Sequence, residues 1–388
     1  MYVKDILSTN INCIELEPKK SICHILYIFS YLCHINMRYI GNKENIIQKI
    51  QSLLQLHKVK GDSIFDFFAG TTNVGQFYKR KGYRVCSSDM MYFSYCLQKA
   101  YIENNAEPVF PLLFKEIKVD STVLFSSPLE RVVEYLNGLE GSEGFIFKHY
   151  TPQGTQELKQ PRMYFSSENG RKIDSIRQKI QEWKENALIQ DMEYFCLLAC
   201  LIESVSFYAN VAGVYAAFQK KWDPRALKPF SLRTIPIISS EKECKAYFGN
   251  SLDLLDKIKT DILYLDPPYN ERQYAPNYHL LETIARYDNP QIRGVTGMRD
   301  YNSQKSSFCS TVGALRDLEA IAQRGEYKYL VMSYNSEGIM HKDDIMQTLA
   351  KYGSVAFEQF EYTRFKSNSN GLSATKKNIF EQLYILSR

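Results

Sequence analysis

The sequence contains no cluster of cysteine and histidine at zinc-site spacing, and its nine cysteines are scattered along 388 residues. The nearest pair, Cys196 and Cys200, lies one helical turn apart in an apolar stretch. An odd, dispersed set provides no disulfide framework of the kind found in small secreted proteins. These absences exclude a structural zinc module and a disulfide-stapled fold, and they favour reduced, buried thiols. We expect no bound metal.

Internal repeats and low-complexity tracts are also absent, and no sign of charge dominates. The 48 basic and 43 acidic side chains leave a net charge of +5, which permits a polyanionic partner without requiring one. Aromatic residues are plentiful, with 28 Tyr and 22 Phe, so stacking surfaces are available. The length fits one large α/β domain with an insertion, or two domains.

Residues 19–35, KKSICHILYIFSYLCHI, have the basic start and apolar body of a signal peptide. No small-residue cleavage site follows, and the run is too short and polar for a membrane span. A third interpretation is translation from Met37, with residues 1–36 as an upstream extension. We favour an added helix or a mis-set start over export, and we expect a cytoplasmic protein that does not engage a membrane.

Hydrophobic periodicity predicts a parallel sheet in the first part of the chain. An amphipathic helix is expected at 44–58 because its apolar residues recur at helical spacing. Buried strands at 62–70 and 83–89 are each followed by a helical pattern, at 72–82 and 90–105. This alternation is typical of a doubly wound α/β fold.

The pattern loosens between 106 and 245, where short helices and a long helical region at 173–219 are expected. Strand patterns then return at 246–276, 327–335, 357–365 and 378–387. The last two of these patterns predict an antiparallel hairpin. The sequence therefore predicts an α/β fold whose mixed, mostly parallel sheet is interrupted by a mainly helical insert.

Two strand ends in the first half carry residues suited to a nucleoside-containing ligand. FDFFAGTTNVG (65–75) has glycines at a strand-to-helix turn, where backbone amides can approach a ligand closely. It is neither a Walker loop nor the three-glycine dinucleotide fingerprint, and a plain tight turn explains it equally well. Asp89 ends the next strand, where doubly wound folds place an acid that accepts from ribose hydroxyls. Capping the helix that begins at residue 90 is an alternative role, and both can hold together.

The strand DILYL (261–265) ends in Asp266, Pro267, Pro268 and Tyr269. The prolines fix φ and supply no N–H, so the backbone there is stiff and presents only carbonyls. Asp266 and the Pro267 carbonyl can each accept one hydrogen of an amine while a planar base stacks on Tyr269. An ordinary turn is the alternative interpretation of this tetrapeptide.

A series of motifs resembles that of the Dam-like DNA adenine-specific methyltransferases of restriction-modification systems. In chain order the motifs are RYIGNK (38–43), DFFAG (66–70), Asp89, GNSLDLL (249–255) and DPPYNERQY (266–274). The resemblance spans most of 37–388 apart from the central insert. It implies a Rossmann-like fold that uses S-adenosylmethionine to methylate the N-6 amine of an adenine flipped from double-stranded DNA. A cognate restriction endonuclease would be a functional partner.

The resemblance also implies roles for individual residues. The catalytic set is Asp266, Pro267, Pro268 and Tyr269, and the cofactor-binding set is Tyr39, Lys43, Asp66, Phe68, Gly70, Asp89, Asn250 and Asp266. Relatives usually carry an acid near the cofactor adenine where this chain has Asn250. The Asn250 amide can still pair with an adenine edge, and Asp253 is a nearby substitute.

Contacts to DNA are expected in three places. Those implied by the motif are Asn270, Arg272 and Tyr274, those in the insert are Lys220, Lys221 and Arg225, and those in the basic loop at 363–377 are Arg364 and Lys366. A solvated surface is the alternative for the last two groups. The expected organisation is an N-terminal extension (1–36), a catalytic domain (37–105 with 246–388) and an inserted target-recognition domain (106–245).

Two other functions stay open at this point. Methylation of adenine in RNA would use the same residues. A DNA-binding protein that has lost its activity is the second alternative, although the intact Asp266, Gly70 and Asp89 argue against it. Enzymes that methylate the cytosine amine tend to carry Ser where Asp266 stands, which argues against that substrate.

Overall fold

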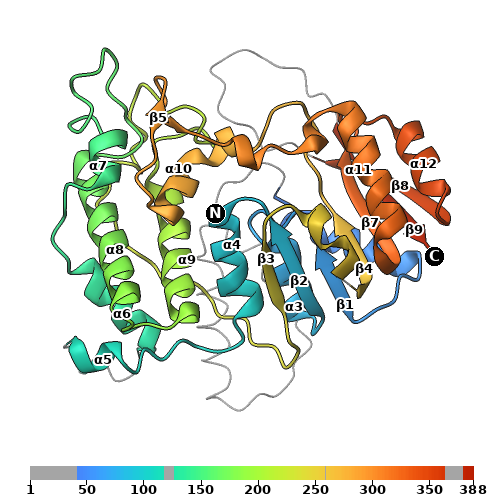
Figure 1. Ribbon diagram of the computed structural model, residues 1–388, viewed down its shortest axis with the longest axis horizontal. Coiled ribbons are helices and arrows are strands. Elements are labelled where there is room, and N and C mark those ends of the chain that lie inside the picture. The colour runs from blue at the N-terminus through green and yellow to red at the C-terminus, as the bar shows by residue number, and fades with distance from the viewer. Residues whose placement is uncertain (1–41, 118–125, 258, 363–378) are drawn as a thin grey trace, which may run out of the picture. The chain divides into compact units, whose positions relative to one another are not determined.

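The computed structural model describes residues 42–117, 126–257, 259–362 and 379–388, and its centre is a seven-stranded sheet (Figure 1). The strands are β1 (Ser63–Asp66), β2 (Arg84–Asp89), β3 (Lys245–Phe248), β4 (Lys259–Leu265), β7 (Glu326–Asn335), β8 (Ser354–Tyr362) and β9 (Ile379–Ser387). Their order is β3-β2-β1-β4-β7-β9-β8. The first five are parallel, β9 is antiparallel to β7, and β8 is antiparallel to β9. The predicted mixed, mostly parallel sheet with a C-terminal antiparallel pair is therefore confirmed.

The sheet is covered on both faces, which explains why its central strands read as continuous apolar runs. Along β1, Ile64 belongs to one hydrophobic cluster and Phe65 to a second. The first cluster includes residues of α2 (Ile47–Leu56), α3 (Asn73–Arg80) and α4 (Tyr92–Gln98). The second includes residues of α11 (Thr311–Arg324) and α12 (Lys342–Ala350).

Strand order reverses at β1, because β2 lies on one side of it and β4 on the other. In open α/β sheets the crevice outside the carboxyl ends of such strands is the usual ligand site. The residues that follow β1, β2 and β4 are those that carried the sequence motifs. The topology therefore brings three distant motifs to one edge of the sheet.

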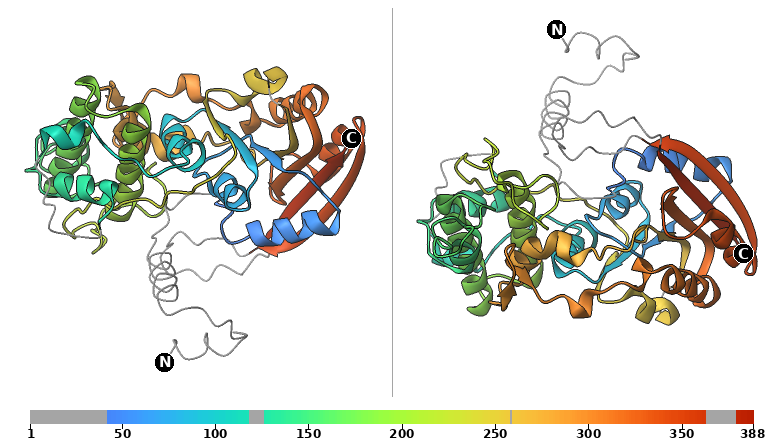
Figure 2. Two further views of the ribbon diagram at one scale, coloured as in Figure 1. Left: turned by 90° about the horizontal axis from the view of Figure 1, so that it is seen from below. Right: turned by 90° about the horizontal axis from the view of Figure 1, so that it is seen from above.

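Helices of the segment between β2 and β3 gather beside the β3 edge of the sheet, as Figures 1 and 2 show. They are α5 (Leu113–Glu116), α6 (Pro128–Asn137), α7 (Phe145–Tyr150), α8 (Ser167–Glu185) and α9 (Asp191–Tyr208). α9 packs against both α8 and α4, which joins these helices to the sheet domain.

Two of the expected helical segments are largely helical but end before the predicted bounds. The helical region expected at 173–219 consists of α8 and α9 and ends at Tyr208: α8 ends at Glu185, Ala187 takes a positive φ of 55°, and α9 starts from a capping box at Gln190. From 209 to 244 the chain forms neither helix nor strand. Within this segment Asn210 accepts from Asp223 N and donates to Gln219 O. The helix expected over 90–105 is α4, which continues as a π-helix at Lys99–Glu103.

The part of the chain after β4 contains α10 (Ala275–Arg286) and a short hairpin of β5 (Ile292–Arg293) and β6 (Met298–Arg299). Short 3₁₀ helices lie at Ser251–Lys257, Asn302–Gln304 and Ser307–Cys309. No helix within the described ranges is long and apolar enough to span a membrane.

Candidate active site

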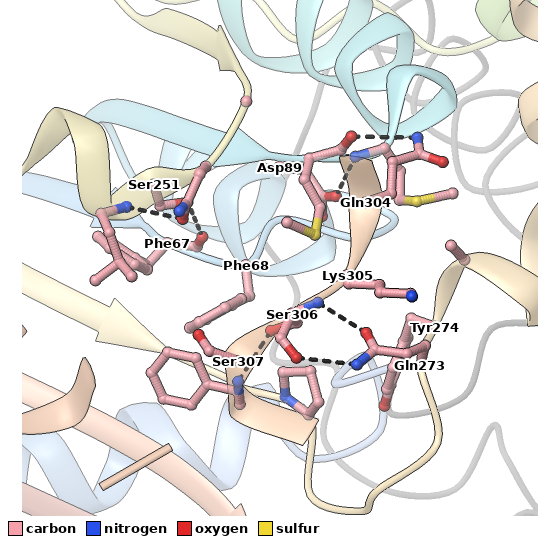
Figure 3. Close-up of a pocket in the computed structure, with 18 of the residues that line it drawn as sticks. Phe67, Phe68, Asp89, Ser251, Gln273, Tyr274, Gln304, Lys305, Ser306 and Ser307 are labelled. Carbon is pink, nitrogen blue, oxygen red and sulfur yellow. Dashed lines mark hydrogen bonds between the residues drawn. The ribbon is translucent and has the colours of Figure 1, made fainter. Parts of the chain in front are cut away.

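A pocket opens where β1, β2, β3 and β4 end, and it encloses about 890 Å³ of empty space including its open mouth. The lining residues are Phe67 and Phe68 after β1, 89–91 at the end of β2, 249–252 after β3, Asp266, Pro268 and 273–275 after β4, and 304–308. Figure 3 shows these groups facing a common space.

Asp89 lines the pocket with a carboxylate that is held by two backbone amides. Its Oδ2 accepts from Gly70 N at 2.9 Å, and its Oδ1 accepts from Met91 N at 2.8 Å. Gly70 has a φ of +49°, a conformation that favours glycine. Burial raises the pKa of Asp89 to about 6, against the opposing effect of the two amides. The predicted capping role is not observed, because α4 begins at Tyr92 with Met91 as its N-cap and has no side-chain cap, while Glu282 accepts from the N–H groups of Tyr92 and Phe93. The Asp89 carboxylate faces the pocket instead.

Asp266 follows β4 and shares a buried lysine with Glu381. The Lys43 Nζ lies 3.0 Å from Asp266 Oδ1 and 2.8 Å from Glu381 Oε1, and Ser333 Oγ donates to the same Glu381 oxygen. Burial raises the pKa of Asp266 to about 6, the Lys43 ammonium opposes this shift, and the Glu381 charge adds to it. Burial lowers the pKa of Lys43, but the two carboxylates outweigh it and raise that pKa well above its usual value. Lys43 is therefore a permanent cation in contact with Asp266.

Asp66 ends β1 between these two acids and is 1% exposed. Burial raises its pKa to about 8, and the negative charges of Asp266 and Asp89 contribute to the shift. It is not among the residues that line the pocket. Three adjacent strands thus each carry a carboxyl group at or directly after their last residue, buried at Asp66 and half-buried at Asp89 and Asp266.

The loop after β3 reaches the pocket through Asn250 and Ser251. Asn250 Oδ1 accepts from Leu252 N at 3.2 Å, so the side chain shapes the first turn of the 3₁₀ helix. Ser251 Oγ donates to Phe67 O at 2.7 Å and lies 2.6 Å from Ser88 Oγ. These bonds fasten the loop to the floor of the pocket.

Comparison with known proteins decides the family. The family model described as D12 class N6 adenine-specific DNA methyltransferase matches residues 39–348. The chain belongs to this family.

The relatives of this chain are named as type II methyltransferases or modification methylases. The chain is 39% identical over 336 residues to the type II methyltransferase M.FokI of Planomicrobium okeanokoites, covering 85% of this chain and 50% of that protein. It is 35% identical to the modification methylase StsI of Streptococcus sanguinis (91% and 52% covered), and 36% identical to M.NlaIII of Neisseria lactamica (91% and 99% covered). The chain thus spans about half the length of the first two relatives and nearly all of the third.

The D12 methyltransferase structure brings some of the predicted site residues together in the pocket and leaves others beside it. Those that line the pocket are Phe68, Asp89, Asn250, Asp266, Pro268 and Tyr274. Those that contact or flank lining residues without lining it are Lys43, Asp66, Gly70, Pro267 and Tyr269. Predicted Tyr39, Arg364 and Lys366 lie outside the described residues.

The predicted DNA contacts differ in their exposure. Arg272 is exposed beyond the tetrapeptide, and half-buried Asn270 accepts from its backbone N–H at 2.9 Å. Lys220 and Lys221 are exposed in the irregular segment after α9. Arg225 is instead half-buried and paired with Asp223, so that any phosphate would compete with an existing ion pair.

Several pocket residues were not expected from the sequence. The segment 304–308 forms a whole wall of the pocket, and Glu381 anchors Lys43 from 338 positions away in the chain. The sequence gives one weak indication of a role for Glu381, which is an acidic residue in a mainly apolar strand pattern. Residues 304–308, QKSSF, carry no periodicity or motif that marks them.

Proposed function

We propose that this chain transfers a methyl group from S-adenosylmethionine to the N-6 amine of an adenine flipped out of double-stranded DNA. The observation that carries the proposal is the position of Asp266 in the pocket lining directly after β4, beside the β1–β4 switch point. Family membership and the named activities of the relatives support it. A modification enzyme of a restriction-modification system, acting in the cytoplasm beside a cognate endonuclease, is the setting we infer.

The lining of the pocket fits the chemistry of the cofactor. The half-buried carboxylate of Asp89 is suited to accept from ribose hydroxyls, and Phe68 provides an apolar floor beside the Gly70 turn. Asn250 lies on the loop after β3, where its amide is available to an adenine edge. When bound, S-adenosylmethionine supplies a methyl group on a positively charged sulfur.

Catalysis in this proposal depends on how Asp266 holds the target amine. An aromatic amine is a poor nucleophile because its lone pair is delocalised into the ring. Hydrogen bonds to Asp266 and to the Pro267 carbonyl favour the pyramidal geometry that exposes the lone pair, so the gain comes from positioning and electrostatics. The ionised carboxylate is the competent form, because only that form accepts without donating.

The target base must leave the duplex to reach Asp266. Extrusion of a base costs a few kcal/mol of unstacking and unpairing, which stacking in the pocket partly offsets. In this proposal Tyr269 supplies the stacking face, Tyr274 lines the same side of the pocket, and Asn270 and Arg272 support the nucleotide at the rim. The segment 106–245 is the inserted target-recognition domain, and its exposed Lys220 and Lys221 contact phosphates.

Replacement of the central acid tests the proposal. We expect Asp266→Ala to lower the methylation rate by at least about 10²-fold, the loss typical of one preorganised hydrogen-bonding group, with DNA binding largely retained. The rate is measured by mass spectrometry of N-6-methyladenine in DNA and, as a separate arm, in RNA. Asp256→Ala is the control, because Asp256 pairs with Arg324 outside the pocket.

Two results would refute the proposal. Failure of the unmodified chain to bind S-adenosylmethionine by calorimetry would exclude the enzyme and favour a DNA-binding protein. A rate for Asp266→Ala within tenfold of the unmodified chain would show that the catalytic assignment is wrong. Methylation of RNA in preference to DNA would replace the substrate while keeping the chemistry.

A further inference from the structure

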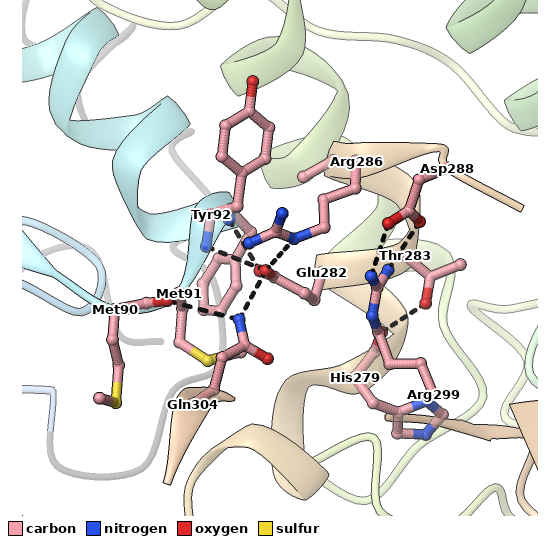
Figure 4. Close-up of polar contacts among 12 residues, drawn as sticks. Met90, Met91, Tyr92, His279, Glu282, Thr283, Arg286, Asp288, Arg299 and Gln304 are labelled. Atoms are coloured by element: carbon pink, nitrogen blue, oxygen red, sulfur yellow. Dashed lines mark hydrogen bonds and ion pairs between the residues drawn. The ribbon is translucent and has the colours of Figure 1, made fainter. Parts of the chain in front are cut away.

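The wall of the pocket at 304–308 is fastened at one end to the strand that carries Asp89. Gln304 Nε2 donates to Glu282 Oε1 at 2.7 Å and lies 3.4 Å from Met90 O. Glu282 is fully buried on α10, and its two oxygens also accept from the N–H groups of Tyr92 and Phe93 at the start of α4 (Figure 4). Glu282 therefore ties this wall to the cofactor side of the pocket.

The same wall is fastened a second time, to the loop that follows the tetrapeptide. Gln273 Nε2 donates to Ser306 O at 3.0 Å, and Ser306 N donates to Gln273 Oε1 at 2.7 Å. The side-chain amide thus pairs with the backbone as a neighbouring strand would. At the far end, the ring of Phe308 packs edge-on against Phe68 at 5.2 Å between centroids.

Lys305 stands between these two fastened positions. Its side chain is exposed, yet it lines the pocket, and it is the only lysine or arginine among the lining residues in the described part of the chain. No acidic side chain within the described ranges pairs with its ammonium group. In Figure 3 the side chain extends along the side of the pocket formed by Gln273 and Tyr274, away from Ser251.

A lysine with a solvated ammonium group is common, but Lys305 differs in that its backbone is held in place. The hydrogen bonds of Gln304 and Ser306 fix the backbone on both sides of Lys305. Ligand binding therefore costs little further conformational entropy of this backbone. The charge is therefore held at the mouth of a pocket whose other ionisable lining groups are the carboxyls of Asp89 and Asp266 and the phenol of Tyr274. Such a cation serves an anion that approaches from outside.

We propose that Lys305 binds a phosphate of the DNA backbone next to the flipped nucleotide. This inference rests on the proposed function. A nucleotide rotated out of the duplex brings its flanking phosphates to the pocket mouth, and phosphate contacts set the register of a protein on DNA. The carboxylate of the cofactor is the other anion within reach of this chemistry, but Lys305 lies on the tetrapeptide side of the pocket rather than beside the loop 249–252.

The test compares Lys305→Ala with Lys60→Ala. Lys60 is an exposed lysine near the amino end of β1, at the edge of the sheet opposite the pocket. Both variants lose one positive charge, but only Lys305→Ala loses it at the pocket. The dissociation constant for a DNA duplex is measured by fluorescence anisotropy at several salt concentrations. We expect Lys305→Ala to weaken DNA binding roughly tenfold. The slope of the logarithm of the binding constant against the logarithm of the salt concentration (the salt slope) should become smaller in magnitude by about one, as for the loss of one phosphate contact. Lys60→Ala should change neither quantity, and Lys305→Arg should retain most of the affinity.

Further arms separate the possible outcomes. The loss in Lys305→Ala should be larger for a duplex that carries the target site than for one without it, because only a flipped nucleotide brings its flanking phosphate to the pocket mouth. An unchanged dissociation constant and salt slope, or equal changes in Lys60→Ala, would overturn the proposal. Weaker binding of S-adenosylmethionine without DNA, at unchanged DNA affinity, would assign Lys305 to the cofactor carboxylate and also overturn it. If the unmodified chain itself neither binds S-adenosylmethionine nor methylates DNA, the proposed function fails instead.

Discussion

The contact of Lys43 with Asp266 leads to a prediction about the pH dependence of methylation. Asp266 is the proposed acceptor for the target amine, and its pKa is about 6 in the free protein. Two variants change the charge beside it in opposite directions. Lys43→Met removes a cation 3.0 Å away, and Glu381→Gln removes an anion that shares the same lysine.

The expected magnitude follows from the charges. Because only the ionised carboxylate of Asp266 is the competent acceptor for the target amine, kcat/KM should fall about tenfold per pH unit below its pKa of about 6. An opposite charge at this distance typically lowers a carboxyl pKa by about 1–3 units. Loss of the Lys43 ammonium should therefore raise the pKa of Asp266 and move the acid limb to about pH 7 or above. Loss of the Glu381 charge should lower the pKa of Asp266 and move the limb below pH 6.

The assay is kcat/KM for DNA between pH 5 and 9 at saturating S-adenosylmethionine. Circular dichroism at each pH establishes that the variants stay folded. His57→Gln is the control, since it removes a titratable side chain paired with Glu358 outside the pocket. Acid limbs that coincide in all variants, or that move the same way in both, would refute Asp266 as the titrating group.

Two further predictions concern stability. The native pKa of Asp66 is about 8 and its ordinary value is 3.8, so the folded state binds the proton more tightly and stability falls as pH rises between these values. Asp66→Asn should raise the free energy of unfolding by about 4 kcal/mol at pH 7 and very little at pH 4; equal urea midpoints at pH 7 would contradict this. Glu282→Ala leaves the N–H groups of Tyr92 and Phe93 without their acceptor and should cost about 3 kcal/mol. Urea denaturation measures this loss, Glu282→Gln should lose less, and a loss below about 1 kcal/mol would show that water replaces the carboxylate.

Much of the sheet could be predicted because its signals are local. A buried parallel strand is an apolar run, and the positions of Asp89 and Asp266 directly after such runs place both at one edge. The helical region expected at 173–219 is largely present, but the break between α8 and α9 could not be predicted, since a positive φ at Ala187 carries no composition signal when the flanks are helical.

The rest of the site depends on contacts between distant residues. Lys43 and Glu381 meet only because β9 pairs with β7 beside β4, and a period-two pattern does not reveal the neighbouring strand. The wall at 304–308 is held by side chains of Gln273 and Glu282, so its own sequence needs no regular pattern. The position of such a segment is set by residues elsewhere in the chain, so its own sequence does not reveal it.

The three carboxyl groups at the ends of β1, β2 and β4 have a consequence for turnover. Burial raises the pKa of all three, and at Asp66 the charges of Asp266 and Asp89 add to the shift. Under the proposed function, the methyl donor arrives with a positive sulfur and leaves as a neutral thioether. At neutral pH the carboxylates of Asp89 and Asp266, whose pKa values are about 6, attract the first and are indifferent to the second. The residues that hold the donor thereby also favour its exchange for a fresh one, which limits inhibition by the spent cofactor.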